Sequence, residues 1–391
     1  MTSKLSTSIL ISFITVVSAA QVKPLLVQPN IILPKDTIVS NNLIKSLNGF
    51  LSLKENPNKD NSFVLAEDLL ETSILLDEIK GIEKSGKFKD DNFYKGYLTN
   101  VVQLNESNYL IQFSYIGVNE NSPILMASFK VIGKNKGNKF YFSSPLKYNT
   151  SSWKIKKTDN VVFHYKNVLN EKSIKKYVKD VSWFDKKLSA TNQSIEWYGC
   201  NNMPELLQNI GVEYKMIYNS QNTSIFTAKE NNTLLIVSGD NNSTFESYDP
   251  HDLWHERLHY IISPTVINKA VDEGCAYLYG SSWGISWEQI LKAFKDKVSS
   301  DKSTDWLKTY EDFYNFGESK EKHLLVPYVL NALIVQKIEK EKGFNAVKEF
   351  LSCGKFQKGN ENYFMALEKL TGITKSNFND SIWKLIAESG K

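Results

Sequence analysis

Apolar residues between positions 40 and 80 recur at the three- and four-residue spacing of amphipathic helices. This spacing predicts two helices, because it gathers apolar side chains on one face of each. The apolar stripes consist of Leu43, Leu47, Phe50 and Leu51, and of Leu65, Leu69, Leu70 and residues 74–76.

From Phe93 the pattern changes to runs rich in β-branched and aromatic residues, divided by connectors rich in Asn, Gly and Ser. These runs predict an antiparallel meander of four strands. They cover residues 97–104, 109–116, 124–132 and 139–144. Two helices followed by a curved four-stranded sheet resemble the nuclear-transport-factor-two-like fold in element order. The resemblance implies an accessory role in substrate docking or packing, and a purely structural role stays open.

Beyond residue 150 short strands and helices follow one another, and after residue 249 the apolar spacing is helical. The predicted elements are a strand at 161–165, helices at 176–188 and 203–211, a hairpin formed by 223–228 and 233–239, and a long apolar helix within 323–343. We therefore predict an α+β chain with an accessory domain at 21–150 and a second domain at 151–391, whose C-terminal part is mostly α-helical.

Composition narrows the class of partner. The 391 residues include 47 basic and 43 acidic side chains, a formal net charge of +4. Because the lysines are scattered instead of forming one basic patch, we expect no nucleic-acid partner. The three cysteines are too few for a disulfide framework, although one bridge between Cys200 and Cys353 stays open.

The first twenty residues have the order of a secretory signal peptide. Lys4 precedes an apolar run from Ile9 to Val17, and small residues follow at 18–20. The run is too short to span a bilayer. The sequence therefore predicts a signal peptide at 1–20, no stable membrane insertion, and a mature protein that is secreted or periplasmic.

The candidate chemistry lies in the stretch DPHDLWHERLHY, which holds three of the five histidines. Asp249 is a suitable N-cap and Pro250 suits the first helical position, so a helix should begin there. It should end before the Ser-Pro pair at 263–264, because a residue before proline avoids helical angles. On this helix His255 and His259 lie one turn apart, where two imidazoles can converge on a metal ion.

His255, Glu256 and His259 form the H-E-x-x-H arrangement of zinc peptidases. Zinc in such a site lowers the pKa of its bound water toward 7. Glu256 is rotated about 100° from His255 and can take the proton of that water, which makes Glu256 the predicted general base. His251, one turn before His255, is assigned either to the surroundings of the metal or to a partly exposed helix start.

A third ligand decides the class of zinc peptidase. Metzincins need a further histidine and a midway glycine, and Thr265 and Ile262 occupy those positions, which excludes that class. A second helical pattern at 268–280 carries Glu273, which an antiparallel helix pair would return toward the histidines. Asp272 is the competing carboxylate, although it points about 100° away from Glu273.

An H-E-x-x-H motif with a downstream glutamate resembles the gluzincins, the zinc peptidase class that includes thermolysin. The stretch EGCAYLYG at 273–280 is similar to the Glu-Gly-x-Ala-x-x-Tyr sequence of aminopeptidase-like members. The resemblance implies a zincin-type catalytic domain in which His255, His259 and Glu273 bind zinc and Glu256 is the general base.

The resemblance also implies a side chain that stabilises the oxyanion, carried by a helix that follows the zinc-binding pair. We assign this role to Tyr328, with His323 as the alternative.

Two features depart from the gluzincin pattern. Thirteen residues, 260–272, separate His259 from Glu273, whereas well-known gluzincins have about eighteen. Tyr277 replaces the aspartate that orients a histidine in thermolysin-like members, so Tyr277 is a candidate for that role.

We expect a secreted zinc peptidase that acts on peptide or protein substrates. The strand at 233–239 precedes the zinc helix, where gluzincins have the edge strand that holds an extended peptide. The chain lacks the Gly-x-Met-Glu-Asn sequence that binds a free amino terminus, which favours an endopeptidase over an aminopeptidase. The alternative is a secreted protein that binds zinc without catalysis, although Glu256 argues against it.

Overall fold

The computed structural model describes residues 25–389 except 191, 192, 223, 302, 318–322, 356 and 358. The predicted signal peptide lies outside the described residues. Two sheets and a large helical region confirm the α+β class. The chain divides into two compact units near Asn149, and residues 207–220 return to the first unit after the second has begun.

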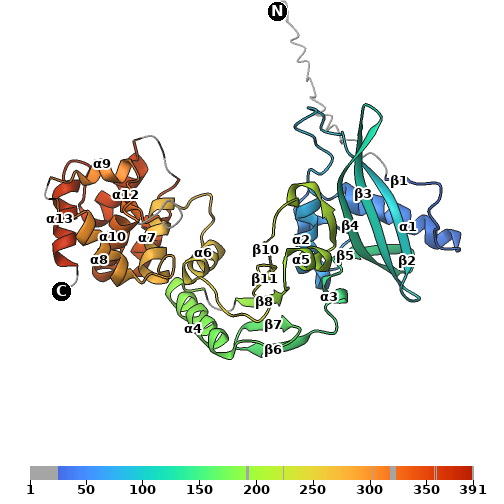
Figure 1. Cartoon of the computed structure of the whole chain (residues 1–391), viewed down its shortest axis with the longest axis horizontal. Coiled ribbons are helices and arrows are strands. Elements are labelled where there is room, and N and C mark those ends of the chain that lie inside the picture. Colours follow the sequence, from blue (N-terminus) through green and yellow to red (C-terminus); the bar gives the residue numbers. More distant parts are fainter. Residues whose placement is uncertain are drawn as a thin grey trace, which may run out of the picture. The chain divides into compact units, whose positions relative to one another are not determined.

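The first unit contains the predicted antiparallel meander (Figure 1). Its four strands are β2 (Lys95–Gln103), β3 (Asn108–Asn119), β4 (Ser122–Lys136) and β5 (Lys139–Ser143). Two further strands of this sheet were not predicted: β1 (Leu26–Val27) pairs parallel with β2, and β9 (Val212–Lys215) pairs antiparallel with β4. The pairing of β9 explains why residues 207–220 belong to this unit, whereas the sequence placed them in the second domain.

Two helices supply the rest of the first core. They are α1 (Thr37–Ser52) and α2 (Leu69–Ile79), as the apolar spacing predicted. Asp36 caps α1 by accepting hydrogen bonds from the Ile38 and Val39 amides. The apolar stripe of α1 is buried, and the ring of Phe50 lies 5.2 Å from that of Phe142 on β5. A four-residue helix, α3 (Leu146–Asn149), ends the main part of this unit.

The sheet of the second unit has the strand order β10-β11-β8-β7-β6. The strands are β6 (Lys154–Thr158), β7 (Val161–Tyr165), β8 (Ser194–Gly199), β10 (Ile225–Glu230) and β11 (Thr233–Ser238). β7, β8 and β11 are mutually parallel, while β6 and β10 pair antiparallel at the two edges. Helix α4 (Glu171–Leu188) connects β7 to β8, and α5 (Met203–Ile210) follows β8.

The expectation that residues 233–239 form an edge strand was wrong. β11 lies between β10 and β8, and it is buried along most of its length. A continuous apolar run suits such a central strand, because both of its faces are covered. The edge strand is its hairpin partner β10, whose side chains are largely exposed.

After residue 249 the described chain forms helices and no named strand, as predicted (Figure 1, yellow to red). These helices are α6 (Pro250–Ile261), α7 (Lys269–Gly280), α8 (Trp287–Lys297), α9 (Trp306–Glu311), α10 (Val326–Lys342), α11 (Phe344–Leu351), α12 (Glu361–Thr371) and α13 (Phe378–Glu388). None of the described helices is both long and apolar enough to cross a bilayer.

Helix α10 is buried along most of its length and packs closely against α7. A Cβ atom on Gly274 of α7 would lie only 2.6 Å from the Cβ of Asn331 on α10, so the missing side chain permits this contact. No disulfide joins any of the three cysteines, so the bridge between Cys200 and Cys353 that the sequence left open is not formed.

Candidate metal centre

The histidines lie on α6, which begins as predicted. The Asp249 carboxylate accepts a hydrogen bond from the His251 amide at 2.9 Å, and Pro250 is the first helical residue. The helix ends at Ile261, just before the Ser-Pro pair. The N-cap fixes where the helical turns start, and thereby which histidines share a face.

Arg257 anchors α6 from the opposite side. Its guanidinium is fully buried and donates two hydrogen bonds to Asp185 of α4, at 2.7 and 2.9 Å, and one to Gln193 at 2.6 Å. Arg257 therefore faces the interior of the unit, not the solvent. It lies about 200° around the helix from His255, and that face packs against α4, where Asp185 supplies the compensating charge.

A glycine sets the distance between α6 and α7. A Cβ atom on Gly280 would lie 2.5 Å from the Pro250 carbonyl oxygen and 2.8 Å from the Cα of His251. The end of α7 therefore touches the start of α6, while the start of α7 reaches His255 and His259. The two helices run antiparallel, which returns Asp272 and Glu273 to the histidine face.

One group of side chains in this helix pair has the geometry of a metal site. His251 Nε2 lies 3.2 Å from His255 Nε2 and 3.4 Å from Glu273 Oε2, and His255 Nε2 lies 3.9 Å from the same oxygen. Ligand atoms on tetrahedral zinc are about 3.3 Å apart, given bonds of about 2.0–2.1 Å. His251, His255 and Glu273 could therefore hold a metal ion.

The other ring nitrogens of the two histidines are anchored. His255 Nδ1 lies 2.9 Å from Asp272 Oδ1, and His251 Nδ1 lies 2.8 Å from the carbonyl oxygen of Ser281. Burial would raise the pKa of Asp272, but hydrogen bonds from His255 and His259 outweigh it and lower that pKa to about 2. An ionised carboxylate and a carbonyl only accept hydrogen bonds. In a neutral ring each Nδ1 therefore carries the proton, which leaves the Nε2 lone pair free to bind a metal ion.

A second group shares His255. His259 Nε2 lies 2.9 Å from Asp272 Oδ2, and His255 Nδ1 lies 2.9 Å from Asp272 Oδ1. These three residues could also hold a metal ion. However, each Asp272 oxygen faces a different imidazole at hydrogen-bonding distance, so the carboxylate links the two rings instead of sharing one point with them. The His259 side chain is also 38% exposed.

The predicted ligand set is thus divided between the two groups. His255 belongs to both, Glu273 lies with His251, and His259 lies with Asp272. The sequence assigned His251 either to the surroundings of the metal or to a partly exposed helix start, and not to the ligands. The signal for its inclusion was present, because His251 and His255 have the same four-residue spacing as His255 and His259.

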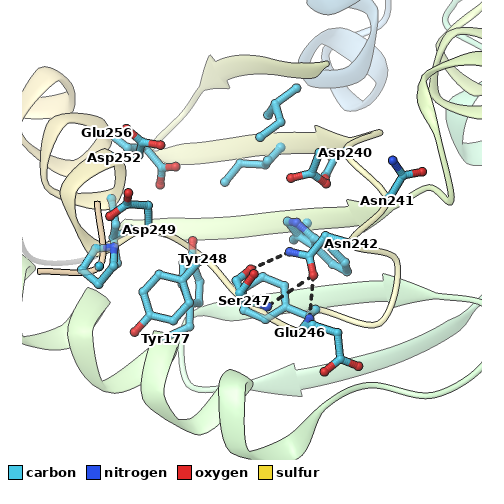
Figure 2. Close-up of a pocket in the computed structure, with 18 residues that line it drawn as sticks. Tyr177, Asp240, Asn241, Asn242, Glu246, Ser247, Tyr248, Asp249, Asp252 and Glu256 are labelled. Atoms are coloured by element: carbon cyan, nitrogen blue, oxygen red, sulfur yellow. Dashed lines mark hydrogen bonds between the residues drawn. The ribbon is translucent and has the colours of Figure 1, made fainter. Parts of the chain in front are cut away.

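Two carboxylates of α6 face a cavity of about 580 Å³ in the second unit (Figure 2). Asp252 and Glu256 are one turn apart and point the same way. Desolvation raises the pKa of Glu256 to about 7, although Arg257 opposes this, and Glu256 Oε1 is buried without a hydrogen-bond partner among the described residues. Desolvation also raises the pKa of Asp252 above its ordinary value. The nearby His251 and His255 oppose this rise without cancelling it.

Tyr328, the residue predicted to stabilise the oxyanion, lies close to Glu273. It is the third residue of α10, its ring centre lies 5.5 Å from that of Tyr277, and burial followed by the charge of Glu273 raises its pKa. The Tyr277 hydroxyl accepts a hydrogen bond from the Leu325 amide at 3.4 Å, and its ring centre lies 6.0 Å from that of His251. His323 is exposed beside Trp283, with ring centres 6.0 Å apart.

Comparison with protein-family models, curated proteins and solved structures gives no match for this chain. Its chemistry therefore has to be argued from its own residues. Two imidazole nitrogens and one carboxylate oxygen that converge within 3.9 Å could bind a divalent ion and leave one coordination position open. Asp252 and Glu256 lie on the same helix as these histidines, and either carboxylate could move a proton.

Proposed function

We propose that this protein is a zinc-dependent peptidase in which His251, His255 and Glu273 hold the ion. One observation carries the proposal: the three ligand atoms lie 3.2–3.9 Å apart, and both histidines have their second nitrogen fixed by an acceptor. Acceptors of this kind set the tautomer and orientation of zinc-binding histidines. Two histidines and one carboxylate are a ligand set of catalytic zinc sites, which keep a fourth position open.

The spacing along the chain supports the same ligands. Seventeen residues, 256–272, separate His255 from Glu273, close to the spacing of about eighteen in gluzincins. The pair of His255 and His259 leaves only thirteen. Moving the motif back by one helical turn therefore removes the main departure from the gluzincin pattern. In this register the motif reads H-D-x-x-H, with Asp252 directly after the first ligand.

With His251 and His255 as the histidine ligands, Asp252 becomes the proposed general base. Asp252 follows His251 as Glu256 follows His255, about 100° around the helix from the ligand that precedes it. Zinc bound at the site would polarise the scissile carbonyl and lower the pKa of an attacking water. Asp252 then takes the proton of that water and delivers it to the leaving amine. Glu256 is the base only if the ion lies between His255 and His259.

Two further features support a peptide as substrate. β10 is an edge strand, and its first residue, Ile225, lines the cavity beside α6. An extended peptide can pair with such an edge by strand addition. Tyr328, close to Glu273, supplies a hydroxyl that can stabilise the oxyanion. The signal-like sequence at 1–20 supports secretion, with the reaction carried out outside the cytoplasm.

The test combines metal content and hydrolysis. Purified protein without residues 1–20 should bind one zinc ion per chain and cleave an unfolded protein or a library of quenched peptides, and chelation should stop the cleavage. Glu368→Gln, a change of an exposed acid on α12, is a suitable control. Zinc binding without cleavage of any substrate would support the non-catalytic alternative, and absence of zinc binding would exclude both.

A further inference from the structure

The cavity beside α6 has an acidic lining. Asp240, Asp249, Asp252 and Glu256 line it, and no lysine, arginine or histidine is among its lining residues. None of these four carboxylates forms an ion pair with another residue in the part of the chain that the structure describes. Clefts lined by one sign of charge concentrate ligands of the opposite sign.

The buried carboxylate gives a second, independent indication of a missing ligand. Asp249 accepts a hydrogen bond from the His251 amide, and Asp240 accepts one from the Ser238 hydroxyl. Glu256 Oε1 is buried beside the cavity and has no donor among the described residues. A buried oxygen without a donor costs free energy. The cavity is therefore built to receive a hydrogen-bond donor from outside the chain.

The rest of the cavity wall is suited to a cationic group at the end of an apolar chain. It contains the aromatic rings of Tyr177 and Tyr248 (Figure 2), and also those of Trp197 and Phe245. Aromatic faces attract guanidinium and ammonium groups and also pack against the methylene groups of basic side chains. Lys176, which does not line the cavity, donates to the Tyr248 hydroxyl, lies 4.6 Å from the centre of the Tyr248 ring and pairs with Asp180 at 3.1 Å.

We propose that this cavity binds a cationic group of the substrate, either the side chain of arginine or lysine or a free amino terminus. This inference rests on the proposed peptidase function for the nature of the substrate. The cavity and the metal ligands meet at Asp252, which lines the cavity and interacts electrostatically with His251, His255 and Glu273. A cation held in the cavity places the neighbouring peptide bond beside the metal site.

Glu246 takes no part in this proposal, although it also lines the cavity. Its carboxylate is turned to the Asn170 side chain and the Thr244 hydroxyl, at 2.7 and 2.9 Å. Asn242 is likewise occupied, because its side chain bonds the backbone of Glu246 and Ser247 (Figure 2). The cationic group is thus assigned to the side of the cavity formed by α6 and Asp240.

Binding can be tested without any cleavage. Chelator-treated full-length mature protein is titrated with tetrapeptides that carry arginine, citrulline, lysine or norleucine at one position, each with a free or an acetylated amino terminus. Citrulline keeps the shape of arginine without its charge. We expect at least tenfold weaker binding of the citrulline and norleucine peptides when the side chain is recognised. If the amino terminus is recognised, acetylation should cause that loss instead.

The matched variant is Asp240→Asn with Asp249→Asn. It removes two charges and preserves the helix cap, because Asn caps helices as well as Asp does. The preference for the cationic peptide should fall below threefold in this variant. It should be unchanged in Glu368→Gln, an exposed acid on α12.

The outcomes separate this inference from the proposed function. Charge-selective binding without hydrolysis by the zinc-loaded protein would leave the inference standing and contradict the peptidase. Hydrolysis of charged and neutral peptides at equal rates would support the peptidase and contradict the inference. Equal binding of charged and neutral peptides overturns the inference. So does displacement of the arginine peptide by 1 mM calcium chloride but not by sodium chloride of equal ionic strength, since the cavity would then be a metal-cation site.

Discussion

His255 donates its Nδ1 proton to Asp272 at 2.9 Å and thereby presents Nε2 to His251, 3.2 Å away. This relationship decides which histidine pairs with which. A carboxylate that accepts from Nδ1 fixes the ring orientation and makes Nε2 more basic. Asp272, considered from the sequence as a competing ligand, is thus placed where it would support a ligand instead.

The first prediction concerns the ligands. His251→Ala, His255→Ala and Glu273→Ala should each abolish stoichiometric zinc binding, because each removes an atom of the converging set. Asp272→Asn should retain zinc with an affinity about 10–100-fold lower, as is typical when a supporting partner of a zinc ligand is lost. Competition against a fluorescent chelator measures both effects.

His259→Ala is the decisive comparison in this series. It removes a histidine one turn beyond the proposed site and should leave the zinc stoichiometry at one. If His259→Ala and Asp272→Asn lose the ion while His251→Ala keeps it, the metal belongs to the second group, and the general base becomes Glu256.

The second prediction concerns the base. Asp252→Asn should bind zinc normally and lose about 10²–10⁴-fold in kcat/KM, because its amide cannot accept the proton of the attacking water. Glu256→Gln should lose less kcat/KM than Asp252→Asn does. Steady-state hydrolysis of one quenched peptide, with zinc content measured on the same samples, compares the two. A larger loss in Glu256→Gln would reverse the assignment.

The third prediction concerns the anchor of α6. Asp185→Asn should destabilise the second unit by about 3 kcal/mol, because it leaves the fully buried Arg257 charge without its partner. All 8 tryptophans lie between residues 153 and 383, so tryptophan fluorescence during urea unfolding reports on this unit. Asp296→Asn breaks the exposed pair with Lys292 and should cost less than about 1 kcal/mol. Equal effects of the two changes would contradict the anchoring role.

The fourth prediction concerns pH. The Glu256 carboxyl has a pKa of about 7 in the folded chain, above its ordinary value of 4.5. Below pH 4.5 the group is protonated in both states and has no effect. Between pH 4.5 and 7 the unfolded chain releases the proton first, so folded stability falls, by up to about 3 kcal/mol above pH 7.

Glu256→Gln removes this loss. In metal-free protein the variant should unfold at higher urea than the wild type at pH 8, and the two midpoints should coincide near pH 4. Glu368→Gln, exposed on α12, serves as the control that should show no such dependence. A midpoint difference of the same size at both pH values would falsify the buried-acid assignment.

Much of the fold follows from local pattern. The apolar stripes at 43–51 and 65–76, the four alternating runs from residue 97, and the cap at Asp249 each predicted an element that the structure contains. Their information lies in spacing within a few residues, which the chain expresses wherever the element packs. The pairings of β1 and β9 could not be read this way, because they join segments far apart in sequence.

The sequence by itself determined that three histidines lie on one helix, since three histidines at four-residue spacing share a face in any α-helix. It also determined that Glu273 or Asp272 would return to that face, because a second helix follows after a short connection. It could not choose the register, as His251, His255 and His259 satisfy the same spacing twice.

Only the tertiary structure decided how the histidines pair. Gly280 lets the end of α7 touch the start of α6, which places Glu273 beside His251 and leaves Asp272 between His255 and His259. The burial of Arg257 against Asp185 fixes the rotation of α6 that makes this possible. The physical reason is that a helical face offers several equivalent ligand pairs, and only contacts from a distant segment, at a distance set by packing, distinguish among them.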